Sequence, residues 1–481
     1  QQQRLKTQVL VIGAGISGST SALTLADAGY EVTLIVPGKE LDGGNSALAQ
    51  GGIVYRSDPN DAKDLEKDIL VAGHHHNYVK AVRHLCQHGP EAVERILMER
   101  APIPFDRLDG KLDFTREGGH GKHRIVHCAD HTGKTIMEGL LQAVRMSPNI
   151  RILTGRTAVD LITTDHHARY KEYRYQLDNQ CLGAYVYNED TREVETLLAD
   201  FTVLATGGVG QVYLHTTNTA ACTGSGIAMA QRAGVRLDNL EYVQFHPTAL
   251  YTRQSHSFLI TEAMRGEGAR LTNAKGEFFM KRYDERADLA PRDIVARAIM
   301  DEMLHSGEPC MYLDVSGVKH DIPTRFPTIY QHCMELGIDI NKKPIPVVPV
   351  AHFFCGGILV DASARTTLTK RGYISKRLAD AIPDWESTGD ERNDDPALIA
   401  QDWATIRNTM WNYVGISRTA SRLHRAFDDL RALSRHLHDF YKNTAISKPI
   451  VDLFHGCQAA YSITQSALRN PRSLGCHHRI N

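Results

Sequence analysis

The most constraining feature of the chain is a strand, a glycine-rich turn, a helix and a second strand in direct succession at its start. Residues 7–12 (TQVLVI) are a short apolar run typical of a buried strand, and they lead into the turn 13–18 (GAGISG). A helical pattern follows and stops at Gly29, and residues 31–36 (EVTLIV) predict a second buried, parallel strand. This order predicts an α/β fold in which the first turn binds an anionic ligand.

Each glycine of the turn has a separate role in such a fold. Gly13 allows the tight turn, Gly15 lets the backbone approach a pyrophosphate, and Gly18 lets the helix pack closely on the strand. The anion then faces the unpaired N–H groups of the helix N-terminus. The alternative is a glycine-rich turn of some other α/β protein. An acid expected after the second strand is absent, since residues 36–39 read VPGK, so the ribose is held otherwise or the ligand is not NAD.

Two further segments suit a backbone that lies against a flat ligand. Residues 43–52 (GGNSALAQGG) carry few bulky side chains, although a flexible surface loop has a similar composition. Residues 201–208 (FTVLATGG) predict another buried strand, whose end would line the ligand crevice of an open α/β sheet. The candidate cofactor-binding residues are Gly13, Ala14, Gly15, Ile16, Ser17, Gly18, Asn45, Ser46, Ala47, Leu48, Ala49, Gln50, Gly51, Gly52, Ala205, Thr206, Gly207 and Gly208.

Composition excludes several classes of protein. Lys plus Arg is 55 and Asp plus Glu is 56, so the overall basic excess of a nucleic-acid binder is missing. No apolar run approaches the roughly 20 residues of a membrane helix. The nine cysteines are scattered without a CxxC pair, which argues against a zinc ribbon or disulfide scaffold and predicts a reducing, cytoplasmic location. The chain starts at Gln1 without a signal peptide, and we expect that it has been trimmed.

The length of 481 residues predicts about three structural units. We expect a Rossmann-type FAD-binding domain of α/β class, built from residues 1–240 and 353–389, with an α+β capping domain inserted at 241–352. Apolar residues at helical spacing predict a three-helix domain at 390–481, with Pro449 suited to the start of the third helix. Residues 384–396 predict an acidic, turn-rich linker.

Polar residues that could perform chemistry fall into three clusters. They are 115–120 (TREGGH); 244–248 (QFHPT) with 261–262 (TE) and 265–268 (RGEG); and 291–293 (PRD) with His352. Singly, each is weak, because a lone His or Arg is more often a structural residue, and Arg265 with Glu267 could be a local ion pair. The run 74–76 (HHH) is best explained as a solvated loop, since no carboxylate or Cys partner has metal-ligand spacing, and no metal site is expected.

Together, the clusters describe a site for a small dianion. Arg292, His246 and His352 can neutralise carboxylates, and Thr261 can add a hydroxyl donor. Glu117 would be an acid in a cationic pocket, suited to an ammonium group. A flavin nearby can accept a hydride while a protein base takes the substrate proton.

Eight motifs in one order carry a resemblance to a known family. GAGISG, ALAQGG, TREGGH, ATGG, FHPTAL, TEAMRGEGA, LAPRDIVAR and AHFFCGG resemble the flavoproteins of the succinate dehydrogenase/fumarate reductase family, from about residue 7 to 365. Within that family the TREGGH segment is similar to the L-aspartate oxidase branch. No His occurs in residues 45–49, where membrane-complex members attach FAD covalently, so the resemblance implies non-covalent FAD.

The resemblance implies oxidation of L-aspartate to iminoaspartate with reduction of O2 to H2O2, and fumarate as an alternative acceptor. This is the first step toward quinolinate and NAD, with quinolinate synthase as the metabolic partner. His246, Thr261 and His352 match substrate-carboxylate ligands, Arg292 matches a proposed proton-transfer residue, and Glu117 matches the residue near the substrate amine. Gln244 and Glu262 complete the substrate-binding set. The alternatives are a soluble fumarate reductase or succinate dehydrogenase-like enzyme and an inactive flavoprotein-like binding module.

Two departures from the family pattern matter. Ser225 stands where the family usually has an Asp, which should weaken the FAD contact expected at this position. A strand–loop–helix unit that supplies a substrate arginine and flavin contacts is missing, because Leu368 is followed directly by Thr369. We favour a segment that is disordered and that bound flavin would order. A true deletion predicts little or no oxidase activity.

Overall fold

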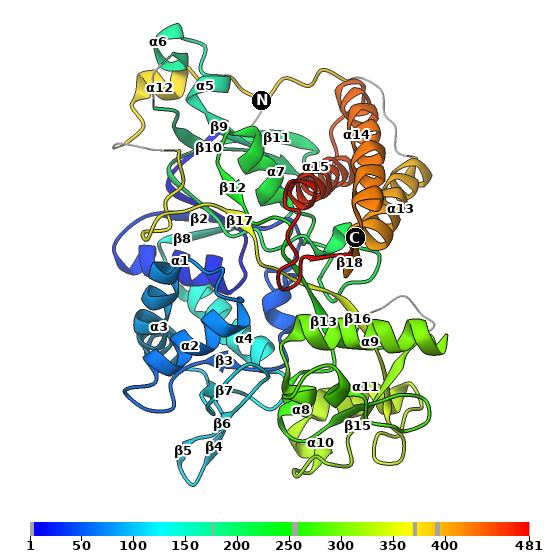
Figure 1. Ribbon diagram of the computed structural model, residues 1–481. Coiled ribbons are helices and arrows are strands. Elements are labelled where there is room, and N and C mark those ends of the chain that lie inside the picture. Colours follow the sequence, from blue (N-terminus) through cyan, green and yellow to red (C-terminus); the bar gives the residue numbers. More distant parts are fainter. Residues whose placement is uncertain (1–3, 176–177, 253–257, 369–372, 390–394, 481) are drawn as a thin grey trace.

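The computed structural model describes residues 4–175, 178–252, 258–368, 373–389 and 395–480 (Figure 1). Within these ranges the chain forms a six-stranded sheet flanked by helices, a separate four-stranded sheet and a group of three long helices. No helix in them is both long and apolar enough to cross a membrane. The fold therefore has the α/β class and the helical C-terminal domain that the sequence predicts.

The six-stranded sheet holds the predicted nucleotide-binding strands. Its strand order is β8-β2-β1-β11-β10-β9. The first four strands are parallel to one another, and the pairs β11-β10 and β10-β9 are antiparallel. Strand β1 lies between its two predicted neighbours, pairing Val9 with Val32 and with Phe201. The strands are β1 (Arg4–Ile12), β2 (Val32–Ile35), β8 (Ile150–Leu153), β9 (Arg156–Thr163), β10 (Cys181–Asn188) and β11 (Glu193–Leu204).

The glycine turn has the geometry expected of a nucleotide-binding loop. Gly13 has a φ of +107°, which side chains rarely adopt, and helix α1 (Ile16–Asp27) begins three residues later. A Cβ on Gly18 would lie 1.8 Å from the carbonyl oxygen of Gly13, so only glycine permits this contact between helix and turn. The positive φ of Gly13 and the close approach at Gly18 therefore explain why the turn needs a glycine at each position.

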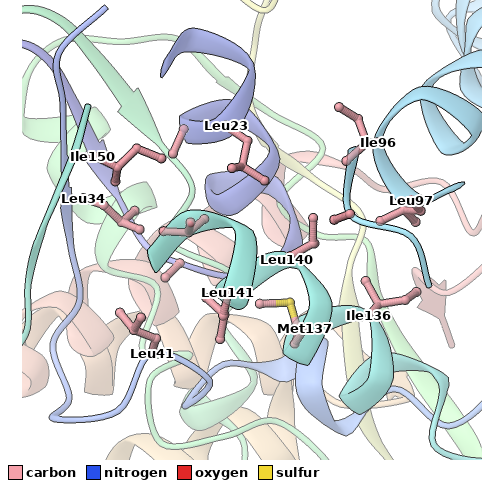
Figure 2. Close-up of a cluster of buried hydrophobic side chains, with 14 of the residues drawn as sticks. Leu23, Leu34, Leu41, Ile96, Leu97, Ile136, Met137, Leu140, Leu141 and Ile150 are labelled. Atoms are coloured by element: carbon pink, nitrogen blue, oxygen red, sulfur yellow. The ribbon is translucent and has the colours of Figure 1, made fainter. Parts of the chain in front are cut away.

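Apolar side chains fix this turn against the sheet. Figure 2 shows Leu23 of α1 and Leu34 of β2 gathered with Met137, Leu140 and Leu141 of helix α4 (Thr132–Met146). All five are nearly or fully buried. Burial of this kind contributes about 25 cal/mol per Å² of apolar surface, and it holds the N-terminus of α1 in place at the ends of β1 and β11.

The inserted unit has its own sheet and its own core. Strands β13 (Val243–Leu250), β16 (Ile345–Phe354), β15 (Met311–Asp314) and β14 (Arg270–Thr272) pair antiparallel in this order. Its helices lie in green below the six-stranded sheet in Figure 1. They are α8 (Ala263–Gly266), α9 (Arg292–Ser306), α10 (Ile322–Arg325) and α11 (Pro327–Glu335), with 3-10 turns at Met280–Arg282 and Ala287–Leu289.

The three predicted C-terminal helices are present. They are α13 (Pro396–Tyr413), α14 (Ala420–Asn443) and α15 (Lys448–Arg469), and Pro449 lies in the first turn of α15. Their buried faces share one apolar core with β13, so the helices brace the root of the inserted unit. After α15 the chain returns toward the junction of the two sheets, where β19 (His478–Arg479) pairs with β18 (Ser417–Arg418).

The remaining elements connect these units. Strands β3 (Ile53–Val54), β7 (Ile125–Val126) and β6 (Phe114–Thr115) form a small sheet, β4 (Arg107–Leu108) pairs with β5 (Lys111–Leu112), and β12 (Leu237–Asp238) pairs with β17 (Gly357–Ile358). The helices are α2 (Ala62–Ala72), α3 (Val79–Val93), α5 (Thr164–His167), α6 (Lys171–Arg174), α7 (Ser225–Arg232) and α12 (Lys376–Asp380). Short turns complete them at Asn45–Leu48, Glu94–Arg100 and Gly210–Val212.

Candidate functional site

A pocket of about 430 Å³ lies where the inserted unit meets the FAD-type domain. Its wall includes the loop at 117–120, Gln244 of β13, Glu262, and Arg292 at the first position of α9. Members of three predicted clusters that are far apart in the sequence therefore line one pocket, whereas His246, Thr261 and His352 lie behind this wall and are not among its lining residues. The C-terminal turn at 474–476 closes another side of it.

Arg292 is the centre of the polar network in this pocket. Its Nε donates to Glu262 Oε2 at 2.7 Å and its Nη1 donates to Gln244 Oε1 at 3.0 Å. Its Nη2 lies 3.6 Å from Glu117 Oε2. Burial lowers the pKa of Arg292, but the carboxylates of Glu262 and Glu117 outweigh this effect and raise it above the ordinary value. Arg292 therefore stays protonated. This favours a role in binding a substrate carboxylate over the proton-transfer role implied by the resemblance.

A second buried cation, Arg265, supports the same carboxylate. Its Nη2 donates to Glu262 Oε1 at 3.2 Å, so Glu262 lies between two guanidinium groups. The suggested local pair of Arg265 with Glu267 is wrong, because Glu267 instead accepts from Arg325 Nε at 2.9 Å. The reason is helical geometry: Glu262 and Arg265 lie three residues apart and face the same side.

The two glutamates of the pocket differ in their protonation. Burial, and then the neighbouring charge of Glu262, raises the pKa of Glu117 to about 7. Burial alone would raise the pKa of Glu262 as well, but Arg292 and Arg265 hold it below its ordinary value. Glu117 is therefore the carboxyl that can exchange a proton near neutral pH.

Glu117 lies directly against the predicted flavin loop. A Cβ on Gly51 would be 2.2 Å from Glu117 Oε1 and 3.7 Å from Thr261 Oγ1. This approach is the physical reason for a glycine at position 51. It also places Glu117 and Thr261 beside one another, at the border between the flavin loop and the substrate pocket.

His246 and His352 meet across two neighbouring strands, with ring centroids 4.9 Å apart. The pairing of β13 with β16 shifts register between Gln244 and Phe245, which leaves His352 as the extra residue of a bulge. A bulge re-aims the side chain that it carries, and here it brings His352 to His246.

Both histidines are neutral donors and not cations. Burial, and then the charge of Arg292, lowers the pKa of His246 far below its ordinary value and that of His352 to about 3. The prediction that they neutralise carboxylates is therefore corrected, because a charged ring would be desolvated beside a guanidinium. The backbone N–H of Thr248 donates to His246 Nδ1 at 3.1 Å, which leaves the proton of the neutral ring on Nε2.

Thr217 orients His352, since its Oγ1 lies 2.6 Å from His352 Nδ1. We expect Thr217→Val to raise the KM for the substrate about fivefold with little change in kcat, because one orienting hydrogen bond is worth about 1 kcal/mol. Steady-state kinetics, which give KM and kcat separately, check this prediction. Thr216→Val is the matched control, since the Thr216 hydroxyl donates to the carbonyl oxygen of Ala351. Equal KM values for the two variants would contradict the assignment.

The three predicted cofactor segments lie against one another, since a Cβ on Gly13 would be 2.1 Å from the carbonyl oxygen of Ala205. Ser46 Oγ accepts from the backbone N–H of Ile16 at 3.1 Å, and Asn45 Oδ1 accepts from Thr219 N at 2.8 Å. A Cβ on Gly226, beside Ser225 in α7, would lie 2.0 Å from Thr206 Oγ1. Gln50 Oε1 is buried without a hydrogen-bond partner among the described residues. These features fit FAD, since the loop presents backbone groups, a free helix N-terminus and an unsatisfied amide oxygen.

A larger cavity of about 1330 Å³ lies beside β11. It is lined by α1, by residues 201–204 of β11 and by residues 360–368. Strand β10 pairs with β11 as far as Leu198, and β1 pairs with β11 from Thr196 to Leu204. The sequence holds no residue between Leu368 and Thr369, so the expected segment is absent from this chain, the prediction of disorder is wrong, and the low oxidase activity expected of a deletion applies to the chain as it stands. Residues 369–372 lie outside the described ranges.

Some residues of the pocket carried no signal in the sequence. His74 lies 3.5 Å from Asp293 Oδ2 and lines the pocket with His76, so these members of the HHH run face the site and not only solvent. Cys476 reaches the pocket from the C-terminal turn. The described residues contain no cluster of His, Cys, Asp and Glu that could hold a metal ion.

Comparison with known proteins decides the family. A family model described as an FAD binding domain matches residues 8–375. L-aspartate oxidase of Pseudomonas aeruginosa is 40% identical, with 100% of this chain and 96% of that protein covered. The chain belongs to the L-aspartate oxidase family of FAD-binding proteins. L-aspartate oxidase 1 of Ralstonia nicotianae is 39% identical over 98% of this chain and 94% of its own length.

The fold itself occurs in a solved structure. An E. coli quinol fumarate reductase structure superposes with a TM-score of 0.84 at 23% identity and covers 100% of this chain and 92% of that one. The alignment with the P. aeruginosa relative spans 526 positions against the 481 residues of this chain, so about 45 positions of the relative have no counterpart here.

Proposed function

We propose that this protein oxidises L-aspartate to iminoaspartate, with O2 reduced to H2O2 and fumarate as an alternative acceptor. One observation carries the proposal: the Glu117 carboxyl lies 3.6 Å from Arg292 and against the flavin loop at Gly51. A pocket for a dicarboxylate without an amino group needs only cations and neutral hydrogen-bond donors, which bind its two carboxylates. An amino diacid also needs one acid, and Glu117 provides it.

The side chains divide the work on the substrate. Arg292 binds one carboxylate by charge, and the neutral rings of His246 and His352 donate N–H groups to the other. Glu117, with a pKa near 7, receives the ammonium group and takes one of its protons at a carboxylate oxygen, so that the amine is neutral when the Cα–H bond breaks. Thr261 adds a hydroxyl beside Glu117.

FAD fits the groove formed by residues 13–18, 45–52 and 205–208 and supplies the hydride acceptor when bound. No His occurs in residues 45–49, which supports non-covalent binding. Ser225, at the start of α7, offers a hydroxyl where the family has a carboxylate. The reaction is the first step toward quinolinate and NAD, and we propose quinolinate synthase as the metabolic partner and the cytoplasm as the location.

The second candidate is a soluble fumarate reductase or succinate dehydrogenase-like activity, favoured by the superposition with fumarate reductase. Anaerobic reduction of the flavin separates the two. L-aspartate should bleach the flavin and succinate should not. Bleaching by succinate alone would favour the second candidate, and failure to bind FAD would indicate a binding module without flavin chemistry.

We expect Glu117→Gln to reduce turnover of L-aspartate far more than reduction of fumarate, by about a hundredfold in the ratio of the two kcat/KM values, since removal of a general base typically costs 10² or more. For the unmodified protein, kcat/KM for L-aspartate should rise as the pH increases through about 7, because Glu117 binds the ammonium group in its ionised form. The variant should lack this rise.

Glu267→Gln is the control, because Glu267 pairs with Arg325 outside the pocket. It should leave both the ratio and the pH profile unchanged. Equal losses of both activities in Glu117→Gln would remove the ammonium role from Glu117.

A further inference from the structure

Two cysteines from distant parts of the chain face each other in the wall of the substrate pocket. Cys355 follows β16 and Cys476 lies in the C-terminal turn, and both line the pocket with Arg292 and Asp293. Both lie beside Tyr242, since the backbone N–H of Cys355 donates to the Tyr242 carbonyl oxygen at 3.0 Å, and the Tyr242 ring lies 6.0 Å from the ring of His477, the residue after Cys476. They are two of nine free cysteines, and no metal cluster of described residues includes them.

The backbone holds both cysteines in place. Cys355 N donates to the Tyr242 carbonyl oxygen at 3.0 Å, and Gly356 packs so closely that a Cβ there would lie 2.0 Å from Asn239 O. On the other side, Arg297 of α9 donates to the Gly475 carbonyl oxygen at 2.8 Å. His477 is buried; its Nδ1 accepts from Arg418 Nη1 and its Nε2 donates to the carbonyl oxygen of Asn470. These backbone contacts therefore hold Cys355 and Cys476 in the same wall of the pocket.

The surroundings divide the roles between the two thiols. The hydrogen bond from Cys476 lowers the pKa of Cys355, and Arg292 lowers it further, although burial opposes both. The pKa of Cys476 is raised by the same hydrogen bond and by burial. Cys355 is exposed to the pocket and Cys476 is half-buried. A thiolate-prone, accessible cysteine beside a second thiol is the arrangement of a peroxide-sensitive pair.

We propose that Cys355 and Cys476 form a reversible disulfide when a hydroperoxide enters the pocket. The Cys355 thiolate attacks the O–O bond of H2O2, which gives a sulfenic acid and one water. The Cys476 thiol then attacks this sulfur, which releases a second water and closes the S–S bond. Two thiols lose two electrons, and the peroxide gains them. The pairing goes beyond the proposed function and depends on it only for the source of H2O2, which is the proposed co-product of the same site.

The disulfide would tie the C-terminal turn to the end of β16 across the pocket that contains Arg292 and Glu117. The cross-link fixes the C-terminal turn to the end of β16 in the pocket wall and narrows access to the pocket, so it slows turnover when peroxide accumulates. Cellular thiols reverse it, since a disulfide in a reducing compartment is transient.

The test treats the reduced full-length protein with H2O2 in the absence of L-aspartate and maps its peptides without reduction. We expect loss of two thiols and one cross-linked peptide pair that contains Cys355 and Cys476. Cys476→Ser should yield no cross-link and should accumulate a Cys355 sulfenic acid that a dimedone probe traps. Cys181→Ser is the matched control and should form the cross-link as the unmodified protein does.

Recovery of Cys355 and Cys476 as separate reduced peptides after two other thiols are lost would overturn the proposal. So would equal dimedone labelling of Cys355 in the unmodified protein and in Cys476→Ser. Because this readout needs no turnover, it remains decisive even if the protein fails to oxidise L-aspartate. If the protein oxidises L-aspartate, peroxide treatment should lower the rate of this oxidation at least fivefold, and dithiothreitol should restore it. Cys476→Ser treated in the same way should keep the rate that it had before treatment.

Discussion

Insertion, between Leu368 and Thr369, of the strand–loop–helix segment that the family resemblance places there should raise L-aspartate oxidation by this chain about a hundredfold or more. The cavity of about 1330 Å³ beside β11 is the space in which that segment would lie, because residues 360–368, which lead to the insertion point, line it. The resemblance implies that the segment supplies a further arginine to the substrate. One preorganised donor at a reacting group is worth about 10²–10³ in kcat.

Peroxide production coupled to a peroxidase measures this gain, and flavin fluorescence measures FAD binding in the same samples. The control insertion is a Gly/Ser linker of equal length, which neither pairs with β11 nor carries an arginine. If the linker raised the rate as much as the native segment, or if the 481-residue chain were already as fast as the restored one, the role assigned to this cavity would be wrong.

The sequence predicted those parts of the fold that local rules decide. The turn at 13–18 requires Gly13 at positive φ and leaves no room for a Cβ at Gly18, so its sequence signature is specific. Pro449 in the first turn of α15 and the helical spacing of its apolar residues located the C-terminal helices in the same way. These features depend on neighbouring residues and need no knowledge of tertiary contacts.

The sequence named candidate site residues but could not predict their contacts or their protonation. That His246 and His352 meet depends on a register shift between β13 and β16, and their neutrality depends on burial beside Arg292. The partner of Arg265 is Glu262 and not Glu267, a choice made by helix geometry. Cys476 reaches the pocket from the C-terminal turn, and no local pattern marks such a long-range contact.

Arg292→Leu should reduce L-aspartate oxidation and fumarate reduction together by about 10³-fold, since both substrates present carboxylates and loss of a buried charge partner costs about 3–5 kcal/mol. The chain with the restored segment provides the activity against which this loss is measured. The variant should also be less stable in urea, because the Glu262 carboxylate, 2.7 Å from Arg292 Nε, loses one of its two guanidinium partners.

The double substitution Arg292→Leu with Glu262→Gln separates these two effects. Glu262→Gln removes the negative charge that Arg292 balances but leaves the buried Arg265 without its carboxylate, so the double variant should regain only part of the lost unfolding free energy and none of the lost activity. Arg325→Leu is the matched control, since Arg325 also pairs with a glutamate but does so through Glu267, away from the pocket. Recovery of activity in the double variant would show that Arg292 only balances Glu262, and the carboxylate-binding role would then have to belong to another residue.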